Sequence, residues 1–229
     1  MIGAHEYDAL NSKEKCIINL FIISGCCMHK KHNFLEGGNK EMANLWPTLD
    51  HPGPMKLMNR DNAAAAATPG LSAAKQQALM VSGTGGVRST SLAGAIFNHK
   101  NNKKGQQDSL QVFMVAQLGY TVAFPVTSNI HYGSHCAAAM KLLVHLPLYQ
   151  KFLEQFQDKK ENGAFNHMGK NLYKALHNIP TLSELAALLL YPQSVTTQYA
   201  VLVRADSNNL GPLHTDVKAH CQAIIAFRG

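Results

Sequence analysis

The sequence has few carboxylates. Its 229 residues include 14 Asp and Glu against 21 Lys and Arg, which gives a formal net charge of +7. No acidic residue occurs between Asp61 and Asp108. The basic residues in that stretch are Lys75, Arg88, Lys100, Lys103 and Lys104. Such an excess of positive charge favours acidic partners, so we expect the last four to face DNA phosphates. The alternative is that they only keep an alanine-rich segment soluble.

Cysteines and long apolar runs are also scarce. The five cysteines are odd in number and widely scattered, which argues against a disulfide framework and for a reducing intracellular compartment. Apolar runs such as 185–190 fall far short of the roughly 20 residues that a membrane-spanning helix needs. We therefore expect an intracellular chain that has no membrane partner.

Local patterns predict a mainly α-helical fold. Asn11 with Glu14 forms the pattern of a capping box, and Thr181 with Glu184 repeats it later in the chain. Asp61 or Asn62 is expected to cap an alanine run, and Gly37-Gly38 is expected to form a turn. The expected helices cover about 12–23, a short stretch through Trp46, 63–67, 72–81, 89–97, 137–146, 149–157, 170–177 and 182–191.

A glycine-rich segment, Gly83-Thr84-Gly85-Gly86, invites comparison with a phosphate-binding loop. Backbone amides of a glycine turn that opens a helix can bind anions. The segment does not match the phosphate-loop pattern, because no lysine follows the glycines and no apolar strand leads into them. The simpler interpretation is a flexible turn, with Ser89 or Thr90 capping the next helix.

One carboxylate is a candidate for metal-dependent chemistry. Two-metal phosphoryl transfer requires two or three carboxylates that converge on ions about 3.5–4 Å apart. Glu184, on an expected helix, could supply one of them, although a Glu three residues after Thr181 is more often a capping-box partner.

The spacing Cys26-x-x-His29 is the most informative motif for a metal. A thiolate and an imidazole two residues apart can both reach one zinc ion, and His135 is our candidate for a further ligand. The alternative is a buried cysteine beside a surface histidine in a basic turn.

Several ordered blocks resemble transposon-derived proteins of mushroom-forming fungi. The first is CCMHKKHNFLEGGNKEM at 26–42, with Trp46 beyond it. The others are NRDNAA at 59–64, LAGAIFN at 92–98, FP at 124–125 with TSN at 127–129, LVHLP at 143–147 and LGPLH at 210–214. On these blocks the chain is similar to the Kyakuja-Dileera-Zisupton superfamily of DDE-type DNA transposases.

The resemblance implies a helical insertion joined to the remnant of an RNase H-like α/β core. In such transposases a Cys-x-x-His motif follows the second catalytic aspartate, and the insertion precedes a final catalytic glutamate. Carried over, residues 1–60 are a core remnant with Cys26 and His29, 61–180 the insertion, and 181–229 a helical core segment. Glu184 would be a vestigial third acid, and magnesium is expected only for an intact transposase.

The sequence also departs from the family pattern. Ile130 and His131 replace a Thr and an Arg, and Val126 stands where an Asp is expected. Met1 lies only about 25 residues before the motif, so we expect the first two catalytic aspartates to be absent and the chain alone to be catalytically inactive. We therefore expect a truncated, transposase-like protein that is nuclear and retains residual DNA binding. Its expected partner is a second copy or a missing N-terminal part. The alternative is a non-catalytic helical protein-interaction module stabilised by zinc.

The zinc interpretation leads to a direct prediction. If Cys26 and His29 bind zinc together with His135, elemental analysis of the purified chain will find about one zinc per chain. The double variant Cys26→Ser/His29→Ala will lose it. Metal-free protein whose thermal stability does not change on chelation would contradict the site.

Overall fold

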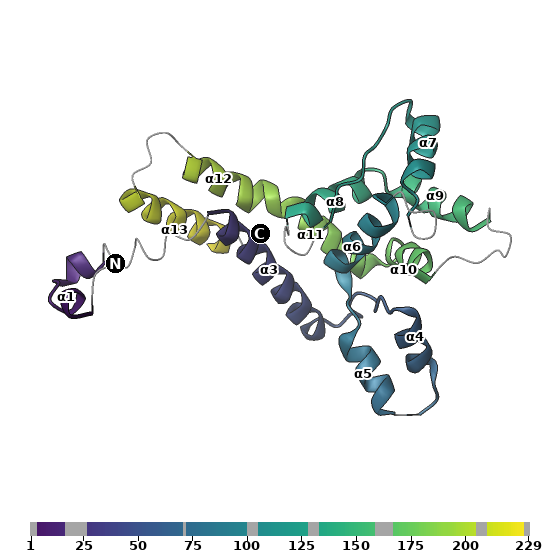
Figure 1. The fold of residues 1–229 in the computed structure, drawn as a ribbon, viewed down its shortest axis with the longest axis horizontal. Helices are drawn as coiled ribbons and strands as arrows, with labels where there is room; N and C mark the ends of the chain where they lie inside the picture. Colours follow the sequence, from purple (N-terminus) through teal and green to yellow (C-terminus); the bar gives the residue numbers. More distant parts are fainter. Residues whose placement is uncertain are drawn as a thin grey trace.

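The computed structural model describes residues 4–16, 27–70, 72–99, 105–127, 133–158, 167–204 and 210–226. Within these ranges the fold is mainly α-helical, as predicted, and strand-like pairing is limited to one isolated bridge between Lys56 and Thr84 (Figure 1). The helices up to the glycine turn are α1 (Ala4–Asp8), α3 (Cys27–Leu45), η1 (Trp46–Thr48), α4 (Arg60–Ala67) and α5 (Ala73–Val81). Those that follow are α6 (Gly85–Phe97), α7 (Gln107–Leu118), α8 (Gly133–Val144), α9 (Leu146–Asp158), α10 (His167–Ala175), α11 (Ile179–Tyr191), η2 (Pro192–Thr196), α12 (Thr197–Arg204) and α13 (Leu210–Ala226). None of the described helices combines the length and apolar character that crossing a membrane requires.

Local caps explain where several helices begin. The predicted capping box near the N-terminus is confirmed, because Asn11 N donates to Glu14 Oε2 at 3.0 Å and Glu14 N donates to Asn11 Oδ1 at 2.9 Å. The expected cap of the alanine run is wrong. Asn59 Oδ1 accepts from Asn62 N at 2.7 Å, so α4 begins at Arg60 and Asn62 lies within its first turn.

The expected turn at Gly37-Gly38 is also wrong, because α3 continues through both glycines. Leu35 is buried and Met42 is half-buried, and they lie two turns apart on one face that packs against the core. An ion pair between Glu36 and Lys40, 3.0 Å long, adds a contact one turn apart on the exposed side. Burial of this face outweighs the helix-weakening effect of the glycines.

The core lies where α6, α8 and α11 pack together, with α7, α9 and α10 around them (Figure 1). Its centre is aromatic. The Phe97 ring stacks on Tyr149 with centroids 5.1 Å apart, and meets Phe124 and Phe152 edge-on at 5.4 and 6.0 Å. Such pairs stabilise a fold beyond the area they bury.

Pro147 lies between the expected helices 137–146 and 149–157, and in the structure it belongs to the start of the second one. It occupies the second position of α9, where a missing N–H costs nothing, since the first turn has unpaired N–H groups in any case.

The helix over 107–118 was not among those expected from the sequence. There α7 buries Leu110 and Met114.

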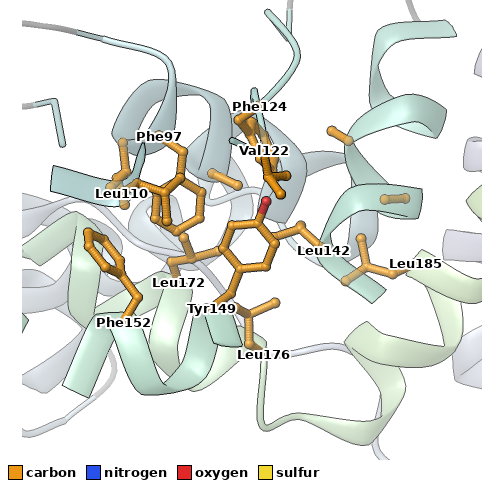
Figure 2. Packing of buried hydrophobic residues seen from close by; sticks show 14 of the residues in the cluster. Phe97, Leu110, Val122, Phe124, Leu142, Tyr149, Phe152, Leu172, Leu176 and Leu185 are labelled. Carbon is orange, nitrogen blue, oxygen red and sulfur yellow. The ribbon is translucent and has the colours of Figure 1, made fainter. Parts of the chain in front are cut away.

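Tyr149 is fully buried, and Figure 2 shows its hydroxyl pointing toward Val122 and Phe124. That hydroxyl has no hydrogen-bond partner among the described residues, and burial raises its pKa well above its ordinary value. An unpaired buried hydroxyl costs about 1–3 kcal/mol.

We therefore predict that Tyr149→Phe raises the free energy of unfolding by about 1 kcal/mol, measured by urea denaturation at neutral pH. Because burial raises the pKa of Tyr149, the folded state keeps the phenol neutral at a pH where the unfolded chain ionises it. The free energy of unfolding of the wild type is therefore unaffected by this group below pH 10 and falls as pH rises above 10. The variant should accordingly lose less stability than the wild type above pH 10. A destabilised variant with an unchanged alkaline profile would contradict both points.

Candidate functional site around Glu184

Glu184 lies in α11, the helix that packs against both α6 and α8. The predicted capping box is wrong here, because α11 begins at Ile179 and its cap is Asn178. The Asn178 Oδ1 atom accepts from Thr181 N at 3.1 Å and from Thr181 Oγ1 at 2.7 Å. Glu184 therefore does not cap its own helix. The residue is only 6% exposed, and its carboxylate is directed toward other elements of the fold.

Each oxygen of the Glu184 carboxylate accepts a hydrogen bond from a distant part of the chain. The indole Nε1 of Trp46, in η1, donates to Oε1 at 2.7 Å. The backbone N–H of Gly86, in the first turn of α6, donates to Oε2, also at 2.7 Å. These lengths are typical of charge-assisted hydrogen bonds. One side chain therefore joins η1, α6 and α11.

The glycine-rich segment is shaped by this carboxylate. Gly85 has a φ of 78°, a left-handed conformation that favours glycine, and a Cβ there would overlap the Glu184 carboxylate. At Gly86 a Cβ would lie 3.0 Å from Leu188 Cδ1 and 3.2 Å from the Glu184 backbone. Glycine at both positions lets α11 approach the start of α6 closely.

The resulting arrangement is an anion site at a helix N-terminus, filled by the chain itself. Thr84 occupies the N-cap position of α6 but makes no side-chain cap bond, and the acceptor comes from Glu184 instead. A carboxylate there is also favoured by the helix dipole. The interpretation of 83–86 as a flexible turn before a helix at 89 is wrong, because α6 begins at Gly85.

Ser89 and Thr90, the expected caps, have a different role. Both are fully buried within α6, where Ser89 Oγ donates to Gly85 O at 2.8 Å. Thr90 Oγ1 lies 2.8 Å from Val87 O and 2.9 Å from Nδ1 of His135 in α8. A Thr90 hydroxyl that donates to the backbone carbonyl can still accept from Nδ1–H, so this arrangement satisfies both groups. His135 is fully buried and links α8 to α6.

Of the other predicted site residues, the structure describes the side chain of Arg88 alone. Arg88 is exposed on α6. Cys26 and the three lysines Lys100, Lys103 and Lys104 lie outside the described residues, and His29 lies in α3, where its side chain is not described. Among the described residues, no three His, Cys, Asp or Glu side chains are placed to hold a metal ion. The zinc site stays a prediction.

Sequence reasoning missed Trp46 and Gly86 as partners of Glu184. The signals that could have indicated them are a single tryptophan and the glycine-rich segment 83–86, whose backbone amides can bind an anion. Neither signal names its partner, since Glu184 lies 138 residues from Trp46 and 98 residues from Gly86.

We predict that Glu184→Gln lowers the free energy of unfolding by about 1–3 kcal/mol, because the amide NH₂ of glutamine would face one of the two N–H donors. Chemical denaturation measures the loss, and Glu41→Gln, at an exposed position on α3, serves as the matched control. In a double-mutant cycle, Trp46→Phe should couple with Glu184→Gln by at least about 0.5 kcal/mol. Additive effects would mean that the bond contributes nothing.

No protein-family model matches this chain, and neither does any curated protein or solved structure. The chemistry of the described residues is therefore the basis for inferring a function.

Proposed function

We propose that this chain is a non-catalytic, transposase-like protein whose described part is a helical interaction module. The observation that carries the proposal is the position of Glu184, the one acid that the transposase resemblance marks as catalytic. Its carboxylate is 6% exposed, and each of its oxygens accepts a hydrogen bond from the protein.

A magnesium ion does not fit this carboxylate. Metal-assisted strand transfer requires carboxylate oxygens that open onto a space shared by ions, substrate and water. Here Oε1 faces the Trp46 indole and Oε2 faces the Gly86 amide. To reach an ion, Glu184 would have to leave the buried Gly86 N–H unpaired, at a cost of about 1–3 kcal/mol, and would also give up its bond to the half-buried Trp46 indole.

The resemblance to transposases suggests an evolutionary origin for the Glu184 contacts. In an intact relative, the RNase H-like core would carry the catalytic strands, and the described helices would correspond to a core remnant (1–60), the insertion (61–180) and the core segment after it (181–229). A position that carried the third acid would then survive in this chain as a structural anchor. The sequence blocks and the anchoring role of Glu184 support this proposal together.

An interaction role is supported by α7, which is apolar on two sides. Leu110 and Met114 are buried in the core, while Val112 and Val115 on the other side are 71% and 43% exposed. The outer side also carries the exposed Asp108 at helical spacing from both valines, so α7 presents an apolar patch with a polar edge, which suits contact with another protein surface.

The proposal is tested with the single tryptophan as a probe. Because Trp46 Nε1 donates to Glu184, a divalent ion that bound this carboxylate would break the bond and change the tryptophan fluorescence. We predict that Mg²⁺ and Mn²⁺ titrations leave the emission unchanged. Incubation of the chain with supercoiled and linear DNA in either ion should yield no nicked or joined product.

Glu184→Leu serves as the control, because it removes both acceptor oxygens without any metal and so shows the emission change that loss of the Trp46 bond produces. A saturable change on adding Mn²⁺, or metal-dependent DNA cleavage that Glu184→Gln abolishes, would overturn the proposal.

A further inference from the structure

One side of α3, next to the side that packs against the core, carries an exposed stripe of residues. Its members, at spacings of four, three and four residues, are Phe34, Gly38, Glu41 and Leu45. Phe34 meets the Tyr199 ring of α12 edge-on at 6.0 Å and is still 45% exposed, and Leu45 is 53% exposed. The stripe is about 16 Å long, or three helical turns, on a helix at the periphery of the fold (Figure 1).

A hollow of about 470 Å³ lies along the C-terminal half of this stripe. Its lining residues, which come from α3 and η1, are Gly38, Glu41, Met42, Asn44, Leu45 and Thr48. Most of the surface exposed in the hollow is apolar, and Met42 also packs against the core. Because the α3 hollow is wide open to solvent, it suits a segment of chain laid across it better than an enclosed small molecule.

Gly38 leaves space over the backbone of α3. A Cβ at Gly38 would have no atom within 4 Å, and the same holds for the neighbouring Gly37. Glycine weakens a helix, and at these two positions no close packing inside the described part of the chain requires it. Another backbone can therefore approach α3 closely at Gly38.

The charged group in the α3 hollow is acidic. Glu41 is exposed, and its carboxylate has no ion pair or hydrogen bond within the described part of the chain. Between Lys40 and Lys56 the sequence contains Glu41 and Asp50 but no Lys or Arg, and Lys40 pairs with Glu36. On a chain whose formal net charge is +7, this local negative charge favours a cationic partner over a nucleic acid or an anionic lipid surface.

The described part of the fold favours a helical partner over an extended one. An extended peptide binds by adding a strand to the edge of a sheet, and strand-like pairing in the described residues is limited to the bridge between Lys56 and Thr84. The other common mode lays the apolar side of an amphipathic helix into an apolar groove, with anchors at spacings of three and four residues. The α3 hollow matches that mode.

We propose that the α3 hollow binds a basic amphipathic helix of another protein. The apolar side chains of that helix contact Met42 and Leu45 and fill the space over Gly38, while a Lys or Arg at its edge pairs with Glu41. The inference rests on the proposed role as an interaction module and names the chemistry of one partner, at a surface that lies away from α7 (Figure 1).

The test uses two fluorescently labelled peptides of about 18 residues, long enough to populate a helix. Both have leucines along one side. The basic peptide has lysines at its other positions, and the acidic peptide has glutamates. Fluorescence anisotropy should show that the acidic peptide binds at least about tenfold more weakly than the basic one. Attraction by the net charge of +7 alone predicts the reverse order, so the order identifies the local acid as the determinant.

Three variants locate the binding site. Gly38→Leu should weaken binding of the basic peptide at least about tenfold, because the new side chain fills the hollow. It replaces a glycine that has open space around it, so the fold is retained. Gly37→Leu is the matched control, equally open but outside the lining, and should stay within about threefold of wild type. Glu41→Lys should weaken the basic peptide at least about threefold and strengthen the acidic one.

Stronger binding of the acidic peptide to wild type would overturn the inference, as would equal weakening by Gly37→Leu and Gly38→Leu or no binding of either peptide. Self-association that Gly38→Leu abolishes and the basic peptide does not compete with would instead assign the hollow to a second copy. Val112→Ser, on the exposed side of α7, separates the two surfaces. Loss of peptide binding in that variant alone would place the peptide on α7, which overturns the α3 assignment and leaves the proposed interaction role standing. None of these results bears on Glu184, which the metal titration tests.

Discussion

A buried carboxylate must find hydrogen-bond donors, and the way Glu184 meets this requirement organises the fold. A carboxylate with so little solvent exposure would be strongly destabilising if it were left unpaired. Its two donors come from Trp46, the residue directly after α3, and from Gly86, at the start of α6. The bonds therefore fix where the long N-terminal helix meets the central helices.

The same site explains the glycines that open α6. A helix N-terminus with a left-handed glycine attracts anions, and in many proteins the anion is a phosphate from a ligand. Here the anion is a side chain of the neighbouring helix, and the space that a Cβ of Gly85 would need is taken by that carboxylate. A pattern that suggests ligand binding in the sequence thus has a structural role in the folded chain.

A buried acid and an exposed base lie near this junction. Glu184 points into the core at the start of α6, while Arg88, two residues after Gly86, points to solvent beside Gly83. The carbonyl of Gly83 also positions the stretch that carries Lys56.

The sequence by itself determined features whose partners lie within one helical turn. It gave the mainly helical fold and the capping box of Asn11 with Glu14, because the interacting groups there are three residues apart. The same spacing of Thr181 and Glu184 does not form a capping box, because Asn178 caps α11. Glu184 instead accepts hydrogen bonds from partners 98 and 138 residues away. Tertiary structure alone decided the contacts of Glu184 and the course of α3 through its glycines. Each depends on which surfaces become buried against one another, and hydrophobic burial over long sequence separations leaves no local pattern to read.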